Sequence, residues 1–384
     1  MKDMEIKESC KELVWVNIIF FGVTTAVALI GAPFYIHHYG VSSFGWILAA
    51  FYAVASGMSI TVGYHRLFAH RSFNAHPVIQ FLVLFFGAAA FEESALRWAS
   101  QHRDHHRYVD TDSDPYSIKK GFFYAHIGWL IFWKHPLNLA NVPDLQKNKM
   151  IMHQYRHYHL WAVGAGILLP LLIGLAVGQP GGALILAVCL RLAVVHHSTF
   201  CINSVCHMFG KATYDIYSSA KDHWFVALLT FGEGYHNFHH RFPSDYRNAV
   251  RWYQWDPSKW AIYLMKSLGL ANDLKRVSTF RILDAKIAAQ NQRACDWIEV
   301  KVGKPHVGDV RLKLDRYYQE IRHKLLSWEH AAQNYHAVIS HRIDSSKSEI
   351  RRTAVLQLKN AREQFEEARR QWESFPARRL GLAF

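Results

Sequence analysis

Long stretches without a charged side chain limit this chain to a small set of folds. Residues 14–36 and 44–64 contain no Asp, Glu, Lys or Arg, and each stretch is close to the roughly 20 residues that cross a bilayer core as a helix. Two further apolar runs, residues 160–177 and 182–202, are separated only by a Gly-Gln-Pro-Gly turn at 178–181. We predict an all-α membrane protein with four transmembrane helices in two hairpins. A soluble protein with a buried helical core is the alternative, which the length of the uncharged runs disfavours.

The distribution of charge predicts the orientation of these helices. The links 35–43 and 177–182 contain no Lys or Arg, whereas the other loops hold nearly all of the basic residues, so both termini are expected to be cytoplasmic. Basic residues beside headgroups or an acidic substrate explain the formal charge of +14, and no nucleic-acid partner is expected. Arg191, inside the fourth run, either snorkels or has a buried partner or a tunnel-associated role. A fifth apolar run, 78–91, is too short to span and predicts a re-entrant or interfacial segment.

Histidines are concentrated in three short clusters. HRLFAH occupies residues 65–70, HRDHH residues 102–106 and HNFHH residues 236–240, and His207 follows the fourth apolar run. In HxxHH the first ring is three and four residues from the other two, so on a helix all three project from one face. The predicted topology places every cluster on the cytoplasmic side. Nine histidines can therefore meet at one place.

The number of these histidines indicates a centre with two metal ions. Neutral imidazole binds iron, zinc, copper or nickel, and nine rings exceed the needs of one tetrahedral zinc. Asp104, Asp110 and Asp114 either orient ligands by accepting hydrogen bonds from their second ring nitrogens or serve as helix caps and solvated turns. Glu233 lies in a Glu-x-x-His motif, which soluble di-iron bundles use for ligands, and it could be a ligand in its own right.

The clusters also resemble the three histidine boxes of membrane fatty-acyl desaturases, the family that includes stearoyl-CoA desaturase. HHRYVDTDSDPYS at 105–117 and NSVCHMFG at 203–210 are similar to two further segments of that family, and the resemblance covers roughly residues 14–260. It implies a di-iron centre whose ligands are His65, His70, His102, His105, His106, His207, His236, His239 and His240.

Three further site residues are implied by the same resemblance. Asn203 would approach the second iron through a water, and Trp98 and Thr199 would line a bent acyl tunnel. Glu92 is the first residue of the sequence EESALRW, which resembles plant and cyanobacterial-type members of the family, whereas animal members have Gln at the position of Glu92. This departure leaves the acyl carrier open between coenzyme A, acyl-carrier protein and an intact membrane lipid.

The implied activity is that of an O2-dependent oxidoreductase of fatty acid biosynthesis that places a cis double bond, at Δ9, in a saturated acyl chain, with acyl-CoA as the favoured substrate. No His-Pro-Gly-Gly motif of a fused cytochrome b5 domain occurs in the sequence. We therefore expect a separate electron donor, cytochrome b5 or ferredoxin with its reductase, at a bacterial inner membrane or the endoplasmic reticulum. An acyl-lipid desaturase and a related membrane di-iron hydroxylase are the alternatives. A metal transporter is disfavoured, because Arg191 is nearly the only ionisable residue in the spans.

A change in composition divides the chain into two predicted domains. Residues 1–271 form the membrane-embedded desaturase domain, and residues 272–384 form a charged helical extension. Apolar residues in steps of four and three form a heptad seam over 312–373, and DSSKS at 344–348 offers a turn. We predict a helical hairpin or short coiled coil that packs within the chain. Self-association, or another partner, through these helices is the alternative.

Overall fold

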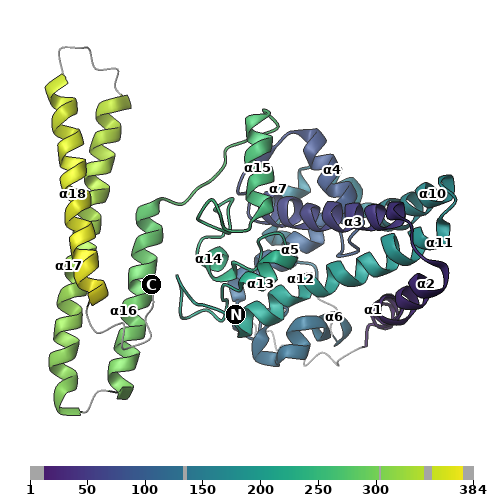
Figure 1. The fold of residues 1–384 in the computed structure, drawn as a ribbon, viewed down its shortest axis with the longest axis horizontal. Coiled ribbons are helices and arrows are strands. Elements are labelled where there is room, and N and C mark those ends of the chain that lie inside the picture. The colour runs from purple at the N-terminus through teal and green to yellow at the C-terminus, as the bar shows by residue number, and fades with distance from the viewer. Residues whose placement is uncertain (1–12, 133–135, 302–303, 341–347, 375–384) are drawn as a thin grey trace, which may run out of the picture. The chain divides into compact units, whose positions relative to one another are not determined.

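The computed structural model describes residues 13–132, 136–301, 304–340 and 348–374. The chain separates into two compact units (Figure 1). One unit contains Met1–Lys211 and Ser218–Arg276, and the other contains Ala212–Tyr217 and Val277–Phe384. The functional division of the chain at residues 271 and 272 stays a prediction.

Four helical segments of the first unit are long and apolar enough to cross a membrane, which confirms the predicted number of spans. They are Trp15–Tyr39, Ser43–Ala69, Tyr158–Ala176 and Pro180–Met208. All four combine α-helix with π-helical turns. In chain order their parts are α1 (Trp15–Ala26), η1 (Val27–Gly31), α2 (Ala32–Tyr39), α3 (Ser43–Met58), η2 (Ser59–Ala69), α9 (Tyr158–Val163), η6 (Gly164–Leu168), α10 (Leu169–Ala176), α11 (Pro180–Gly182), η7 (Ala183–Leu190) and α12 (Arg191–Met208).

Two short turns join the spans into the predicted hairpins. Gly40 and Gly178 adopt φ angles of 68° and 73°, a left-handed conformation that glycine enters without steric penalty. The hydroxyl of Ser42 donates a hydrogen bond to the side-chain oxygen of Gln179. The turns of the two hairpins therefore contact each other.

Arg191 has buried partners and does not snorkel. Its side chain is almost fully buried, and its guanidinium donates to the carbonyl oxygens of Ala187 at 3.0 Å, of Gly166 at 2.8 Å and of Ala89. The guanidinium carbon also lies 5.6 Å from the ring centroid of Tyr52. One buried cation thus ties the fourth span to the third and to the turn after residue 88.

Shorter elements connect the spans and carry most of the candidate site. They are α4 (Pro77–Ala88), α5 (Ala95–Tyr108), η3 (Ile118–Lys120), η4 (Tyr124–Gly128), α6 (Trp129–Phe132), η5 (Leu139–Asn141), α7 (Pro143–Gln146), α8 (Lys149–Arg156), α13 (Trp224–Leu229), α14 (His236–Arg241) and α15 (Pro257–Ser267). The fifth apolar run forms the 12-residue helix α4, too short to span a bilayer. Strands β1 (Asn74–Ala75) and β2 (Ala271–Asn272) pair antiparallel, a small departure from the all-α prediction.

A continuous core fixes the position of η2, which begins the histidine site. Tyr64, Leu84 and Leu96 have no or almost no exposed surface, and they belong to one buried apolar cluster contributed by η2, α4 and α5. Gln154 on α8 donates from its amide to the Tyr64 hydroxyl and to the Leu84 carbonyl, at 2.7 Å each. Because its donors are satisfied, a polar side chain is tolerated inside this core.

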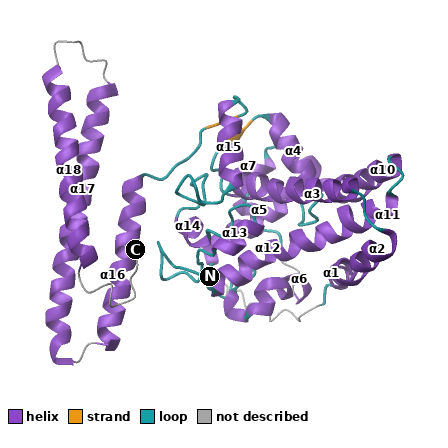
Figure 2. Ribbon diagram, viewed as in Figure 1, coloured by secondary structure: helices purple, strands orange, loops and turns teal. Residues whose placement is uncertain are grey.

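The second unit is helical and has its own core. Its helices are α16 (Thr279–Lys301), α17 (Lys304–Ser340) and α18 (Ser348–Ser374), and α17 packs along α18 as the hairpin prediction requires (Figures 1 and 2). The predicted seam residues Leu314, Ile321, Leu325, Phe365 and Trp372 are buried in this core. Positions 344–347 of the predicted turn lie outside the described residues. Coiled-coil geometry stays a prediction.

Candidate metal centre

Four structural elements bring the histidines together. His65 lies on η2, which ends at Ala69, and His70 follows as its C-terminal cap. Helix α5 carries the second cluster, α12 carries His207 and α14 carries the third cluster. The spacing of HxxHH on α5 places its rings on one face, as the sequence predicts.

The nine histidines form two groups, each compact enough to hold a metal ion. Within each group the candidate ligand atoms lie within 4.8 Å of one another. The first group contains His65, His70, His102, His106 and His239, and the second contains His105, His207, His236 and His240. All nine histidines of the predicted ligand set are present, and both groups draw on the second and third clusters. Neither group could form from one cluster alone.

Carboxylates hold the outward nitrogens of two of these rings. His65 Nδ1 lies 2.8 Å from Glu233 Oε2, and His105 Nδ1 lies 2.8 Å from Asp114 Oδ1. An ionised carboxylate only accepts hydrogen bonds, so each Nδ1 carries the proton and each Nε2 presents a lone pair. This arrangement, with the imidazole held by a carboxylate behind it, is typical of metal-ligating histidine.

The inward nitrogens face one another at distances that suit a shared cation. The Nε2 atoms of His65 and His239 are 3.0 Å apart, and those of His105 and His240 are 3.3 Å apart. Two nitrogen lone pairs that face each other at this distance repel. Two nitrogen ligands that each lie about 2.1 Å from the same ion, with an N–metal–N angle near 90°, are about 3 Å apart. The donor set and its spacing therefore fit a metal ion in each group.

Six of the nine candidate ligands, all outside the membrane-spanning segments, are held in their neutral form. Burial is the main cause, and neighbouring imidazoles add to it, so the pKa lies well below its usual value for His70, His102, His106, His236, His239 and His240. Neutral imidazole is the form that binds metals. The site is thus ready to bind a cation without first losing protons.

Glu233 orients a ligand and does not belong to either histidine group. Its Oε1 accepts from Arg66 Nε and Nη2 at 3.1 and 2.9 Å. Its Oε2 accepts from Asn248 Nδ2 at 2.7 Å and lies 2.8 Å from His65 Nδ1. Burial alone would raise the pKa of Glu233, but His65 and Arg66 outweigh it and hold the pKa below its usual value. Both carboxylate oxygens of Glu233 therefore have partners on the outer side of His65, and neither is placed among the candidate ligand atoms.

The three predicted aspartates have different roles. Asp114 contacts His105 directly. Asp110 accepts from the backbone N–H of Ser219 at 2.8 Å, and the Ser219 hydroxyl lies 2.6 Å from His207 Nδ1, so its effect on a ligand is indirect. Asp104 accepts from the side-chain amides of Asn138 and Asn141 and fixes the neighbouring loop.

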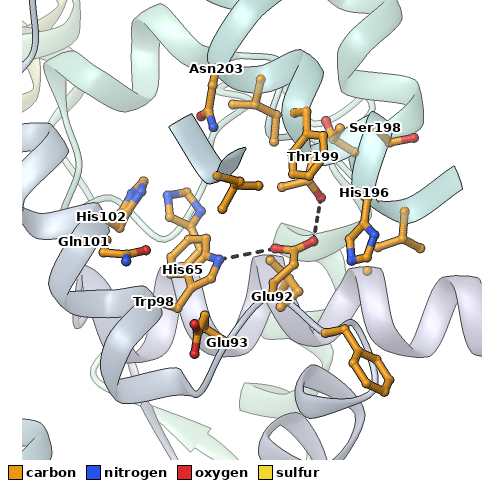
Figure 3. Close-up of a pocket in the computed structure, with 18 of the residues that line it drawn as sticks. His65, Glu92, Glu93, Trp98, Gln101, His102, His196, Ser198, Thr199 and Asn203 are labelled. Atoms are coloured by element: carbon orange, nitrogen blue, oxygen red, sulfur yellow. Dashed lines mark hydrogen bonds between the residues drawn. The ribbon is translucent and has the colours of Figure 1, made fainter. Parts of the chain in front are cut away.

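A cavity of about 560 Å³ leads away from the histidines. Its lining includes His65 together with the three other predicted site residues, Trp98, Thr199 and Asn203 (Figure 3). His236 also lines it. The Trp98 ring also stacks on His102, with centroids 4.8 Å apart. Most of the remaining lining is apolar, as is typical of a site for a hydrophobic ligand. The water-mediated role of Asn203 stays a prediction.

Glu92 links the two predicted substrate residues. Thr199 Oγ1 donates to Glu92 Oε1 at 3.0 Å, and Trp98 Nε1 donates to Glu92 Oε2 at 3.3 Å (Figure 3). Burial raises the pKa of Glu92 to about 7, although both hydrogen bonds oppose this rise. Sequence reasoning noted the residue only as a departure from the familiar Gln. An acidic side chain directly after an apolar run was the signal that could have identified it.

The sequence is similar to proteins of one known family. A family model described as "Fatty acid desaturase" matches residues 42–262. "Probable acyl-CoA desaturase" of Schizosaccharomyces pombe is 43% identical over 253 residues, 65% of this chain and 53% of that protein. "Acyl-CoA desaturase 1" of Saccharomyces cerevisiae is 43% identical over 251 residues, 65% of this chain and 49% of that protein.

A mammalian relative is matched over more of its own length. "Stearoyl-CoA desaturase" of Homo sapiens is 34% identical over 297 residues, 73% of this chain and 80% of that protein, whereas the match spans only about half of each yeast relative. The matched family model covers both histidine groups and the residues that line the cavity beyond them, apart from those of the first span. The chain belongs to the fatty acid desaturase family.

Proposed function

We propose that this protein is a membrane acyl-CoA desaturase that uses O2 and two electrons to introduce a cis double bond into a saturated acyl chain. The single observation that carries the proposal is the convergence of nine histidines into two groups at the end of an apolar cavity. The names of the relatives support acyl-CoA as the substrate class. The Δ9 position rests on the resemblance of the three clusters to the stearoyl-CoA desaturase type.

Two iron ions are the proposed cofactors. The ligands would be the five histidines of the first group and the four of the second, with Asn203 approaching the second ion through a water. When bound, the iron centre would activate O2 so that two hydrogens can be removed from an unactivated alkyl chain, with reduction of O2 to two waters. Five nitrogen ligands in the first group exceed a tetrahedral zinc set, which supports iron.

The chain's own residues position the substrate and keep water out. An acyl chain in the cavity would pass Trp98 and Thr199, which are part of the cavity wall. Glu92 fixes both side chains at once, and in its neutral form it adds no charge beside the hydrocarbon. Glu233 and Asp114 keep protons on Nδ1 of His65 and His105, so that Nε2 of each ring stays available as a ligand.

The topology of the proposal follows the charge distribution. We place both termini and the histidine site on the cytoplasmic side, because the basic residues cluster in the loops on that side of the four spans. A separate donor, cytochrome b5 or ferredoxin with its reductase, would deliver electrons there. This arrangement would let a water-soluble carrier present the acyl chain to the cavity.

Expression in a host that lacks its own acyl desaturase tests the proposal. Mass spectrometry of total fatty acids, with localisation of double bonds, is expected to detect new cis-Δ9 monoenes. The control is His106→Ala, which removes one ligand of the first group and should abolish them. Hydroxylated acyl chains would replace the proposal with a hydroxylase, and an unchanged profile from iron-loaded protein supplied with a reductase and donor would contradict it.

A further inference from the structure

The residue after the first histidine of each cluster hydrogen-bonds outside that cluster. Arg66 follows His65, Arg103 follows His102 and Asn237 follows His236. Arg66 and Asn237 are fully buried, and all three hydrogen-bond to residues outside their own histidine cluster. The two arginines are chemically alike but have different partners, and this difference indicates a specific role for Arg66.

The guanidinium of Arg66 is shared between two buried carboxylates. Beside its two bonds to Glu233 Oε1, Arg66 Nη1 donates to Asp256 Oδ2 at 3.2 Å, and Nη2 lies 3.0 Å from Asp256 Oδ1. Nη1 also donates to the carbonyl oxygen of Tyr246 at 3.0 Å. A planar guanidinium with fixed partners on both sides has one orientation. That orientation determines where Glu233 lies.

Glu233 transmits this orientation to a metal ligand. Arg66 occupies Oε1, and Oε2 of the same carboxylate lies 2.8 Å from His65 Nδ1. Asp256 completes the network from the far side: it also accepts the backbone N–H of Asn248 at 2.9 Å and of Lys259 at 3.0 Å. The result is a continuous chain of contacts from Asp256 through Arg66 and Glu233 to His65.

The backbone just before the third cluster leaves room for the contacts between Asp256, Arg66 and Glu233. Gly232, next to Glu233, has a φ angle of 105°, and a Cβ there would lie 2.6 Å from Asp256 Oδ1. Only glycine fits such a position without displacing the carboxylate. Close approach of Asp256 to the third cluster is therefore built into the fold.

We propose that Arg66 and Asp256 are positioning residues for the first metal group, acting on His65 through Glu233. The inference rests on the proposed metal centre and adds to it two residues that contact no metal. A carboxylate behind a ligating histidine fixes its tautomer and raises its basicity, and loss of such a partner typically weakens metal affinity about 10–100-fold. The second group has Asp114 for the same purpose and does not depend on Arg66.

Arg103 provides the matched comparison within the same chain. Its guanidinium donates to the carbonyl oxygens of Phe68 and Ala69 at 2.8 and 2.9 Å, and it pairs with both oxygens of Asp144 at 2.7 and 2.9 Å. This is also an Arg–Asp pair beside a histidine cluster, but Asp144 contacts no ligand ring in the described structure. Asp144→Asn therefore makes the same chemical change as Asp256→Asn without reaching a ligand.

The test is a chelator competition on the full-length protein loaded with iron. We expect Asp256→Asn to release one of two irons at a chelator concentration about 10–100-fold lower than the wild type, and to retain the other. Mössbauer spectra should show a changed signal for one iron site and an unchanged signal for the other. Asp144→Asn should match the wild type in both measurements.

A second variant keeps the inference testable if Asp256→Asn does not fold, since Asp256 also accepts backbone N–H groups. Arg66→Lys retains the positive charge but loses the fork that orients Glu233, and it is expected to weaken retention of the same iron. A folded Asp256→Asn or Arg66→Lys protein with wild-type retention and spectra of both irons would overturn the inference. A wild-type protein that binds no iron would contradict the proposed function instead.

Discussion

Glu92 gives the protein a pH dependence that can be worked out from the structure. Burial raises its pKa from 4.5 to about 7, which corresponds to about 3 kcal/mol in favour of the neutral form. Glu92 borders the cavity, so the ionised form places a negative charge beside the bound acyl chain, which is unfavourable in an apolar site. Because the neutral form is present below the raised pKa and is lost above it, binding of the acyl chain should weaken as the pH rises through about 7.

The expected change follows from the protonated fraction. With a pKa of about 7, Glu92 is about 90% neutral at pH 6 and about 10% neutral at pH 8. If only the neutral form admits the chain, the apparent Kd should rise about tenfold between these values. The assay is competitive binding of a saturated acyl-CoA to purified protein, which avoids any pH dependence of electron transfer.

Glu92→Gln is the control, because an amide of nearly the same size cannot ionise. Its Kd should be nearly constant between pH 6 and pH 8 and close to the wild-type value at pH 6. The reasoning would be refuted if the wild type bound equally well at both pH values, or if Glu92→Gln showed the same loss as the wild type.

Three further predictions concern metal binding and stability. His70→Ala should weaken metal binding in the first group alone, and His236→Ala in the second group alone. The measurements are the metal content per chain and the Mössbauer signal that each variant loses. Loss of both metals from either variant would contradict two separable groups. Arg191→Met should leave three buried carbonyls without this donor and lower stability by about 3 kcal/mol or more, seen as a lower Tm in detergent; an unchanged Tm would contradict its anchoring role. Trp372→Ala, in the core of the second unit, should destabilise that unit by about 3–5 kcal/mol, measured by helix melting, and a wild-type melt would show that the side chain is not packed there.

Local patterns in the sequence predicted the spans and the candidate ligands. An uncharged run of spanning length needs no partner to be recognised, and HxxHH places its rings on one face of a helix wherever that helix lies. The division of the nine histidines into groups of five and four could not be predicted in this way. It depends on the tertiary structure that brings α5 and α14 together, with His239 in the first group and its neighbour His240 in the second.

The contacts around the ligands link residues far apart in the sequence. Arg66 and Asp256 are separated by 190 positions, and Glu92 and Thr199 by 107. Sequence reasoning treated Glu233 as a candidate ligand because it lies in a Glu-x-x-His motif. Two of its actual partners, Arg66 and His65, come from another cluster. The sequence allowed a buried partner for Arg191 as one interpretation beside snorkelling, but backbone carbonyls as partners leave no trace in a sequence.

The metal content of the purified protein tests the central claim most directly. Elemental analysis and Mössbauer spectroscopy of the wild type are expected to find two irons per chain in two distinguishable environments, because the proposed ligand sets contain five and four histidines. One metal ion per chain, or zinc in both positions, would contradict the di-iron centre on which the proposed desaturation depends.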